Sequence, residues 1–450
     1  MGKYKYVSIV TKPPGPKARE IIERDSKLLM QSYVRWFPLV IKRGYGSIVE
    51  DVDGNRYIDL NAGIAVLSTG HVHPKVVEAI KSQAELFLHY SLTDFYYELA
   101  VRYAEKLFSM LPWSDNKIFY TNSGAESVEA AVKVAKGYYK GVRNYFIAFI
   151  GAFHGRTMGA LSFTASKPIH RKYFFPMMPG VVHVPYPYSY RCPFKSSSPE
   201  ECGYAVLDYI EKWVLNKYVP ADEVAGIMIE PIQGEGGYII PPKEFMKGLR
   251  ELADKYGILF IADEVQSGMG RTGKLLAIEH FNIRPDLITL AKGIASGLPL
   301  GALVGRADVM NLPPGSHANT FGGNPVALAA ADATLDLLKN GLMDNARRQG
   351  EYLLKRLNEM MEKYEIIGDV RGIGLMAGVE LVRDRRTKEP AVKEQAEIIR
   401  KCFENGVLLI GAGISSLRFS PPLVITRDEL EEALDIVENV IKEVNKQILS

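Results

Sequence analysis

The stretch Ile258-Leu-Phe-Ile-Ala-Asp263 consists of apolar residues followed by a carboxylate. A second stretch, Ile288-Thr-Leu-Ala-Lys292, likewise ends on an amine. Short apolar runs of this kind are typical of buried strands in a parallel sheet. A charged residue at the end of such a strand usually faces a ligand, because parallel strands open onto their binding crevice at the carboxyl edge. The two stretches therefore predict a parallel sheet whose edge presents an amine and a carboxylate.

Further strand candidates surround these two, and amphipathic segments such as 125–139 and 242–256 lie between several of them. Alternation of strands and helices predicts an α/β fold with a large, mostly parallel, seven-stranded sheet. The seven candidate strands are 117–120, 145–150, 181–185, 224–230, 258–263, 287–291 and 302–305.

We expect two domains, since 450 residues exceed what one hydrophobic core usually organises. The sheet domain is predicted over residues 76–335. Residues 336–450 are expected to form a smaller α+β domain, joined by residues 1–75, which include a hairpin turning at Asp53-Gly54. Pro13-Pro14-Gly15-Pro16 predicts an extended arm near the start of the chain.

Charge and cysteine usage exclude several classes of function. The chain has 55 basic and 52 acidic residues, which gives no support to nucleic-acid binding. The N-terminus lacks the apolar core of a signal peptide, and no run approaches the ~18 apolar residues of a membrane span. The three cysteines indicate neither a zinc finger nor a disulfide framework, so we expect a reducing, cytoplasmic setting: Cys192, Cys202 and Cys402.

An amine and a carboxylate at neighbouring strand ends suit pyridoxal phosphate. Its aldehyde forms a Schiff base with a lysine, here Lys292, and its ring nitrogen needs an acidic partner, here Asp263. The segment Asn122–Glu129 follows a strand and opens a helix, which is typical of a phosphate site, although a capped helix packed on the sheet would look the same. Phe153 follows another strand and could stack on a planar ring, or simply pack in the core.

Two other motifs are weaker. Gly268-Met-Gly-Arg-Thr-Gly273 matches a dinucleotide fingerprint, but it does not directly follow its strand and lacks the acidic residue about 20 positions on. As a phosphate loop it fails because Leu275 stands where Ser or Thr would hold magnesium. No metal is expected, since the candidate ligands lack a carboxylate or cysteine at ligand spacing: His71, His73 and His154.

The joint pattern resembles the class III pyridoxal-phosphate aminotransferases, the group that includes the ornithine and 4-aminobutyrate aminotransferases. The resemblance covers essentially the whole chain beyond the N-terminal arm. It implies a fold-type-I transferase with a large sheet domain and a smaller α+β domain. The segments that carry it are 63–71, 122–129, 153–157, 230–236, 262–268, 291–293, 319–325 and 372–375.

The resemblance also implies roles at the cofactor. Lys292 would hold the cofactor and shuttle the proton, and Asp263 would pair with the ring nitrogen. Thr320 would reach the phosphate of the neighbouring subunit, which implies a homodimer or a dimer of dimers. The remaining cofactor contacts would be backbone amides at Gly124 and Ala125, Phe153 stacked on one ring face with Val265 against the other, a contact from Gln266 to the ring hydroxyl, and Glu230 supporting the network from behind.

Substrate roles follow from the same resemblance. Arg418 would bind the α-carboxylate of 2-oxoglutarate, and a bidentate guanidinium suits that task. Glu235 would neutralise Arg418 when an ω-amine substrate is bound, and Arg156 would take the carboxylate farther from the reacting carbon. A structural ion pair remains the alternative for both arginines.

Two positions point to different amines. Ile64 stands where eukaryotic ornithine aminotransferases carry a tyrosine. Bacterial 4-aminobutyrate enzymes have an isoleucine at this position, as this chain does. Thr93 and Asp94 fall in the expected substrate entrance, where a carboxylate would attract a second ammonium group such as that of ornithine; Asp94 could equally be an exposed helix cap. The sequence thus predicts transfer of a distal amine to 2-oxoglutarate, with ornithine favoured and 4-aminobutyrate next.

Two alternatives stay open. An amino-acid racemase of the same family would need a second base opposite Lys292 and no carboxylate switch, so Arg156 and Glu235 argue for transamination. A nicotinamide-linked oxidoreductase would use the glycine-rich loop at 268–273 and would lack the yellow colour of bound pyridoxal phosphate.

Overall fold

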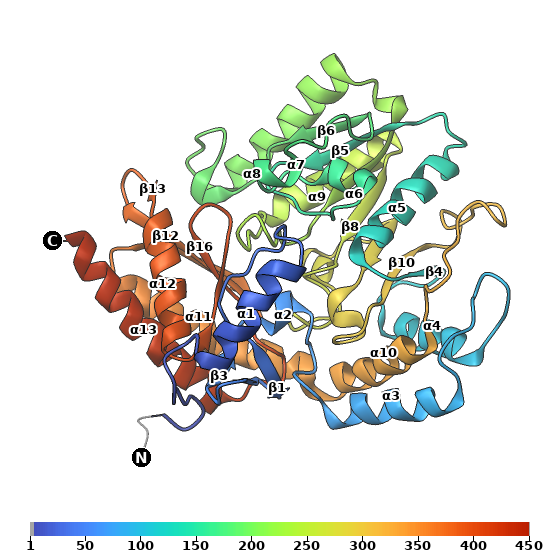
Figure 1. Cartoon of the computed structure of the whole chain (residues 1–450). Helices are drawn as coiled ribbons and strands as arrows, with labels where there is room; N and C mark the ends of the chain where they lie inside the picture. Colours follow the sequence, from blue (N-terminus) through green and yellow to red (C-terminus); the bar gives the residue numbers. More distant parts are fainter. Residues whose placement is uncertain (1–3, 450) are drawn as a thin grey trace. The chain divides into compact units, whose positions relative to one another are not determined.

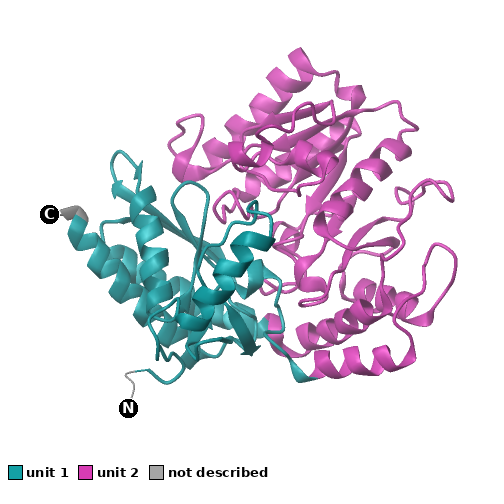
Figure 2. Ribbon diagram, in the orientation of Figure 1, with its two compact units in different colours: residues 1–74, 344–450 teal, residues 75–343 magenta. Residues whose placement is uncertain are grey.

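The computed structural model describes residues 4–449 of the chain. They divide into two compact units, which Figure 2 colours separately. Unit 2 runs without interruption from Lys75 to Met343. Unit 1 is assembled from the residues on either side, up to Pro74 and from Asp344 onward, so the chain passes between the units twice.

Unit 2 contains the seven-stranded sheet that the apolar stretches predict, in the order β4-β10-β9-β8-β7-β5-β6 (Figure 1). β10 runs antiparallel to both of its neighbours, and the other four pairings are parallel. β7 and β8 are buried at every residue, as strands covered on both faces should be. The predicted α/β fold class is therefore confirmed. The strands are β4 (Asn116–Thr121), β5 (Tyr145–Phe149), β6 (Val181–Val184), β7 (Val224–Ile229), β8 (Leu259–Asp263), β9 (Leu287–Leu290) and β10 (Gly301–Arg306).

The helices of unit 2 begin and end at residues with clear capping chemistry. α5 begins after Ser123 and α10 after Asn324, and both side chains accept backbone N–H groups of the first turn. α9 ends at Gly257, whose φ of 62° favours glycine. α5 packs across β9 and β10. The α-helices are α3 (Pro74–Leu86), α4 (Glu98–Met110), α5 (Gly124–Tyr138), α6 (Met158–Phe163), α7 (Pro168–Arg171), α8 (Pro199–Asp208), α9 (Lys243–Tyr256) and α10 (Pro325–Leu337), with π-helical turns at Tyr209–Tyr218 and Leu338–Leu342.

Unit 1 carries two smaller sheets, ordered β1-β2-β3-β14 and β11-β12-β16-β15, with β13 paired to β12. The expected hairpin is present as β2 and β3, and Asp51 closes its turn by accepting the backbone N–H groups of Asp53 and Asn55. Within residues 4–449, no helix of either unit combines the length and apolar character needed to cross a membrane. The elements are α1 (Pro16–Leu28), β1 (Ile41–Tyr45), β2 (Ile48–Asp51), β3 (Arg56–Asp59), α2 (Ala62–Ala65), α11 (Met343–Lys363), β11 (Ile367–Ile373), β12 (Met376–Asp384), β13 (Glu389–Pro390), α12 (Val392–Glu404), β14 (Val407–Leu408), β15 (Ile410–Ala412), β16 (Ser416–Phe419) and α13 (Arg427–Leu449).

The N-terminal arm turns into a helix sooner than its prolines predict. α1 begins at Pro16, at the end of the stretch expected to be extended. Its first turn is capped from a distance, because the Asp53 carboxylate accepts the backbone N–H groups of Lys17 and Ala18 at 3.0 and 2.9 Å. A cap supplied by a residue 36 positions away leaves no local sequence signal.

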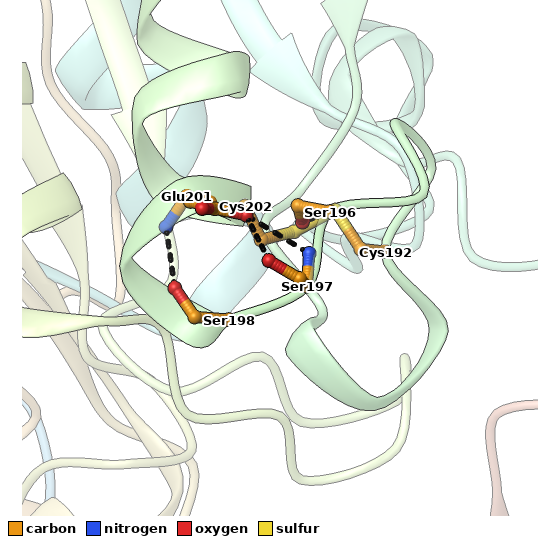
Figure 3. The surroundings of a disulfide bond; sticks show 6 residues. All are labelled: Cys192, Ser196, Ser197, Ser198, Glu201 and Cys202. Carbon is orange, nitrogen blue, oxygen red and sulfur yellow. Dashed lines mark hydrogen bonds between the residues drawn. A yellow bond between two sulfur atoms is a disulfide. The ribbon is translucent and has the colours of Figure 1, made fainter.

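The expectation of no disulfide is wrong. Cys192 and Cys202 are bonded, with their Cα atoms 5.9 Å apart (Figure 3). The bridge joins the loop that follows β6 to helix α8, whose first turn is capped by Ser198. Spacing alone did not reveal the pair, because its geometry depends on the loop folding back on the helix. Cys402 remains a buried free thiol.

The disulfide should stabilise unit 2 against unfolding. Closing a loop of 10 residues lowers the entropy of the unfolded chain by an amount worth about 3 kcal/mol. For a unit of this size, we expect Cys192→Ser to lower the melting temperature by about 5 °C. Calorimetry with and without reductant provides the control, since reductant should shift the parent protein and leave the variant unchanged. An unchanged melting temperature in Cys192→Ser would contradict this prediction.

Candidate active site

Five strands of unit 2 deliver candidate residues to the same edge of the sheet. β10 runs opposite to the other six strands of the sheet. The same direction is therefore shared by β4, β5, β7, β8 and β9. Their carboxyl ends therefore meet along one edge. The candidates that follow these ends are Gly124 and Ala125, Phe153, Glu230, Asp263 with Val265 and Gln266, and Lys292.

Asp263 ends β8 and is 3% exposed. Its Oδ2 accepts a hydrogen bond from His154 Nδ1 at 2.6 Å, and its Oδ1 accepts from Thr289 Oγ1 and from the backbone N–H of Val265, both at 3.0 Å. Burial opposes charge on His154, but the hydrogen bond and negative charge of Asp263 outweigh it and raise the imidazole pKa. The carboxylate is thus held in place by three hydrogen-bond donors and is shielded from water.

His154 and Thr289 are site residues that the sequence did not single out. His154 was expected to be structural, and its contact with Asp263 comes from the next strand but one in the sheet. Thr289 lies inside β9, opposite Asp263 in the parallel register. The available signal was their sequence position next to predicted residues, His154 beside Phe153 and Thr289 three residues before Lys292, since polar side chains near the carboxyl ends of parallel strands face the same crevice.

Glu230 follows β7 and links two loops. Its Oε1 accepts the backbone N–H of Phe153 at 2.9 Å, and its Oε2 accepts that of Gly234 at 2.8 Å. Burial raises the pKa of this carboxyl to about 7, against the opposing effects of nearby His154 and of the two backbone donors. Glu230 therefore fixes the position of the Phe153 loop relative to the turn that carries Glu235.

Lys292 lies two residues beyond β9 and has a φ of 45°. A non-glycine residue in this left-handed region is strained, and such strain is concentrated at functional sites. The preceding strand end is tied to α5, because Ser127 Oγ donates to the Leu290 carbonyl at 3.0 Å. The backbone that carries the amine is therefore fixed against the helix that begins at Gly124.

The start of α5 forms a close-fitting cradle. Glu126 accepts the backbone N–H of Asn122 at 2.7 Å, while its own N–H is capped by Ser123. A Cβ on Gly124 would lie 2.8 Å from Val265 Cγ1, so only glycine allows the helix start to approach that loop. The N-terminus of a 15-residue helix offers backbone N–H groups and a partial positive charge, which suit a phosphate.

The glycine loop at 268–273 is folded into the interior. The N–H groups of Gly268, Gly270 and Gly273 donate to carbonyl groups nearby in the chain, at 2.9, 3.3 and 3.0 Å. Arg271 within it is 1% exposed. Backbone donors that are already used cannot hold a pyrophosphate, which argues against a dinucleotide site here.

The proposed substrate residues of unit 2 divide into two groups. Arg156 is exposed and its guanidinium lies 5.5 Å from the ring centre of Phe153, whereas Glu235 accepts from Lys167 Nζ at 2.7 Å. The second group is the segment around Thr93, whose hydroxyl donates to the Asn319 carbonyl at 3.3 Å. The other two members of this group, Asp94 and Thr320, are both exposed.

Two further candidates belong to unit 1. Ile64 is 47% exposed and has a φ of 68°, which is an outlier for a β-branched residue. It sits in a turn of four left-handed residues over 62–65, so α2 is not a right-handed helix throughout. Arg418 lies on β16 and is 4% exposed.

The family model for class III aminotransferases matches residues 29–441. The chain belongs to the class III aminotransferase family. An alanine/serine racemase from Pyrococcus horikoshii is 44% identical over 97% of this chain and 93% of its own length. An acetylornithine aminotransferase from Methanopyrus kandleri is 42% identical over 93% of this chain and 97% of its own length. Among solved structures, an amine transaminase from an uncultivated Pseudomonas species in its pyridoxal-phosphate-bound form is similar to this chain, with a TM-score of 0.86 and 30% sequence identity. The match covers 92% of this chain and 98% of the transaminase chain.

Class III aminotransferases use pyridoxal 5'-phosphate, and the residues of this family member fit that group. Gln266 Oε1 is buried and finds no hydrogen-bond partner among residues 4–449, as expected of an acceptor reserved for a ligand. The Gly124 cradle suits the phosphate, and the buried Asp263 carboxylate suits a protonated ring nitrogen. When bound, the cofactor supplies an electron sink for the carbanion formed at the substrate.

Proposed function

We propose that this class III aminotransferase family member moves the distal amino group of an ω-amino or diamino acid to 2-oxoglutarate. In this proposal Lys292 binds the cofactor covalently and transfers the proton at the reacting carbon. Asp263, oriented by His154 and Thr289, keeps the ring nitrogen protonated. Backbone amides at Gly124 and Ala125 hold the phosphate, and Phe153, Val265 and Gln266 contact the ring.

The observation that carries the proposal is the exposed guanidinium of Arg156 beside Phe153. 2-Oxoglutarate has a second carboxylate far from the reacting carbon, and a guanidinium suits that group. The substrates named for the racemase relative, alanine and serine, have no such carboxylate. Arg418 is assigned to the α-carboxylate of 2-oxoglutarate, and Glu235 to neutralising that arginine during the ω-amine half-reaction.

Ornithine is the favoured donor, followed by 4-aminobutyrate. The contact between Thr93 and Asn319 supports this choice, because it ties the segment bearing Asp94 to the residue before Thr320. In a homodimer, or a dimer of dimers, both would then approach the partner's cofactor together. A carboxylate there attracts a substrate with a second ammonium group. Ile64, which lacks a hydroxyl for the α-amine, is the reason that 4-aminobutyrate stays close behind.

Racemisation is the second candidate, and the 44% identity to a racemase over nearly the whole chain favours it. The two functions differ in their need for an oxo acid. A transaminase forms glutamate from 2-oxoglutarate and ornithine, whereas a racemase converts an L-amino acid to its D form with no oxo acid present. A panel of ω-amines and α-amino acids, tested with and without 2-oxoglutarate, separates them. D-amino acid without glutamate formation would overturn the proposal.

Asp94→Ala tests the choice of donor. We expect it to lower kcat/KM for ornithine about tenfold relative to 4-aminobutyrate, because one charge interaction is lost at the entrance. Asp222→Ala, in a short exposed turn of unit 2, is the control and should leave the ratio unchanged. An unchanged ratio in Asp94→Ala would remove the argument for ornithine.

A further inference from the structure

A short segment of unit 2 supports two of the proposed active-site residues at once. It comprises residues 166–170, at the start of helix α7 (Figure 1). Lys167 Nζ donates to Glu235 Oε1 at 2.7 Å, and the His170 ring packs edge-on against Phe153 with ring centres 5.7 Å apart. Ser166 Oγ lies 2.9 Å from His170 Nδ1 and fixes that ring.

Glu235 lies in a turn that is anchored by Glu230. The Glu230 carboxylate accepts the N–H of Gly234, and a Cβ on Gly236 would lie 2.1 Å from Gln233 Oε1. The hydrogen bond to Glu230 thus anchors the backbone one residue before Glu235. Because its side chain is 18% exposed, its charge is only partly screened by water, and the Lys167 ammonium beside it, 33% exposed, compensates much of that charge.

The charged side chains around Phe153 determine the charge of the ligand that this part of the site attracts. Burial, and after it the positive charges of Arg156 and Lys167, lower the pKa of His170, whereas the negative charge of Glu235 raises it. All three charged groups thus lie close enough to act on one imidazole. With neutral His170, the cluster carries two cations and one anion, for a net charge of +1. Without Lys167, the net charge would be zero.

We propose that Lys167 is a specificity-determining residue: by compensating the charge of Glu235 it lets the site accept the second carboxylate of a dicarboxylic substrate. This inference rests on the proposed function, in which Arg156 and Glu235 face that substrate. Lys167 acts through Glu235 and needs no contact with the cofactor. It is a positioning residue, and its effect is on binding of dicarboxylates rather than on the chemical step.

The test uses glutarate, a dicarboxylate that cannot react, titrated by calorimetry into the holoenzyme. Lys167→Gln should weaken glutarate binding about tenfold, since one nearby positive charge is lost. Lys167→Arg should stay within about threefold of the parent protein, because it keeps the charge. Lys212→Gln removes an ion pair of the same 2.7 Å length on the exposed surface of unit 2 and should change nothing.

A double variant makes the test independent of any loss of stability. Glu235→Gln in the Lys167→Gln background should restore glutarate binding, because the carboxylate charge that Lys167 offsets in the parent protein is gone. Unchanged binding in Lys167→Gln, failure of the double variant to recover, or a parent protein that binds glutarate no better than butyrate would each overturn the inference. Failure of the proposed function is distinguishable: the parent protein would then form no glutamate from 2-oxoglutarate, while the glutarate affinities would still report on Lys167.

Discussion

Lys292→Ala should lower kcat/KM with the preferred amine by at least about 10⁴-fold, the largest loss expected of any single change in this chain. In the proposed function the lysine both binds the cofactor covalently and moves the proton at the reacting carbon, so one substitution removes both roles. Initial rates with added pyridoxal phosphate, together with retention of the cofactor after dialysis, measure the effect. Borohydride should fix the cofactor to the parent protein and not to the variant.

The matched control is Lys274→Ala, an exposed lysine of the same unit whose Nζ donates to the Glu279 carbonyl. It should leave both the rate and the covalent labelling intact. The φ of 45° at Lys292 adds a second readout, because alanine is no better suited to that backbone than lysine and the melting temperature should not rise. Activity of Lys292→Ala within tenfold of the parent would contradict its assignment.

Asp263→Asn should lower kcat by about 10² to 10³-fold while the cofactor still binds. The substitution keeps the size of the side chain but removes the charge that, in the proposed function, keeps the ring nitrogen protonated. It also removes the negative charge that lies against His154 Nδ1, so the imidazole pKa should fall. Rapid-reaction rates of the first half-reaction, together with NMR titration of His154, test both consequences.

Thr289→Val is the comparison for Asp263→Asn. It removes one of three donors to the same carboxylate and leaves the charge in place, so its effect on kcat should be about tenfold or less. A loss in Thr289→Val as large as that in Asp263→Asn would mean that the orientation of the carboxylate, and not its charge, is what the reaction requires.

The sheet could be predicted from sequence because its signal is local. The central strands such as β7 and β8 are short apolar runs, and burial on both faces of a parallel sheet demands that composition. The site edge followed from the same logic, since Asp263 and Lys292 each end such a run. The candidates after β4, β5 and β7 could be placed on that edge for the same reason.

What the sequence did not reveal depends on side chains meeting across long separations. Asp53 caps α1 from the turn of the hairpin, and Cys202 meets Cys192 because a loop folds back on α8. His154 reaches Asp263 from another strand end, and Lys167 reaches Glu235 across 68 positions. None of these contacts has a periodicity or a spacing, so each becomes visible only once the backbone has been placed.

The divided construction of unit 1 has a consequence for biosynthesis. β3 is an inner strand of its sheet, and one of its two neighbours is β14, which is made almost 350 residues later. A ribosome adding roughly 5–20 residues per second therefore leaves β3 without that neighbour for many seconds, while the whole of unit 2 emerges and folds. During that interval the open edge of the hairpin is a ready template for unwanted pairing with another nascent chain. Unit 1 cannot complete this sheet until residues 407–408 of β14 have been made.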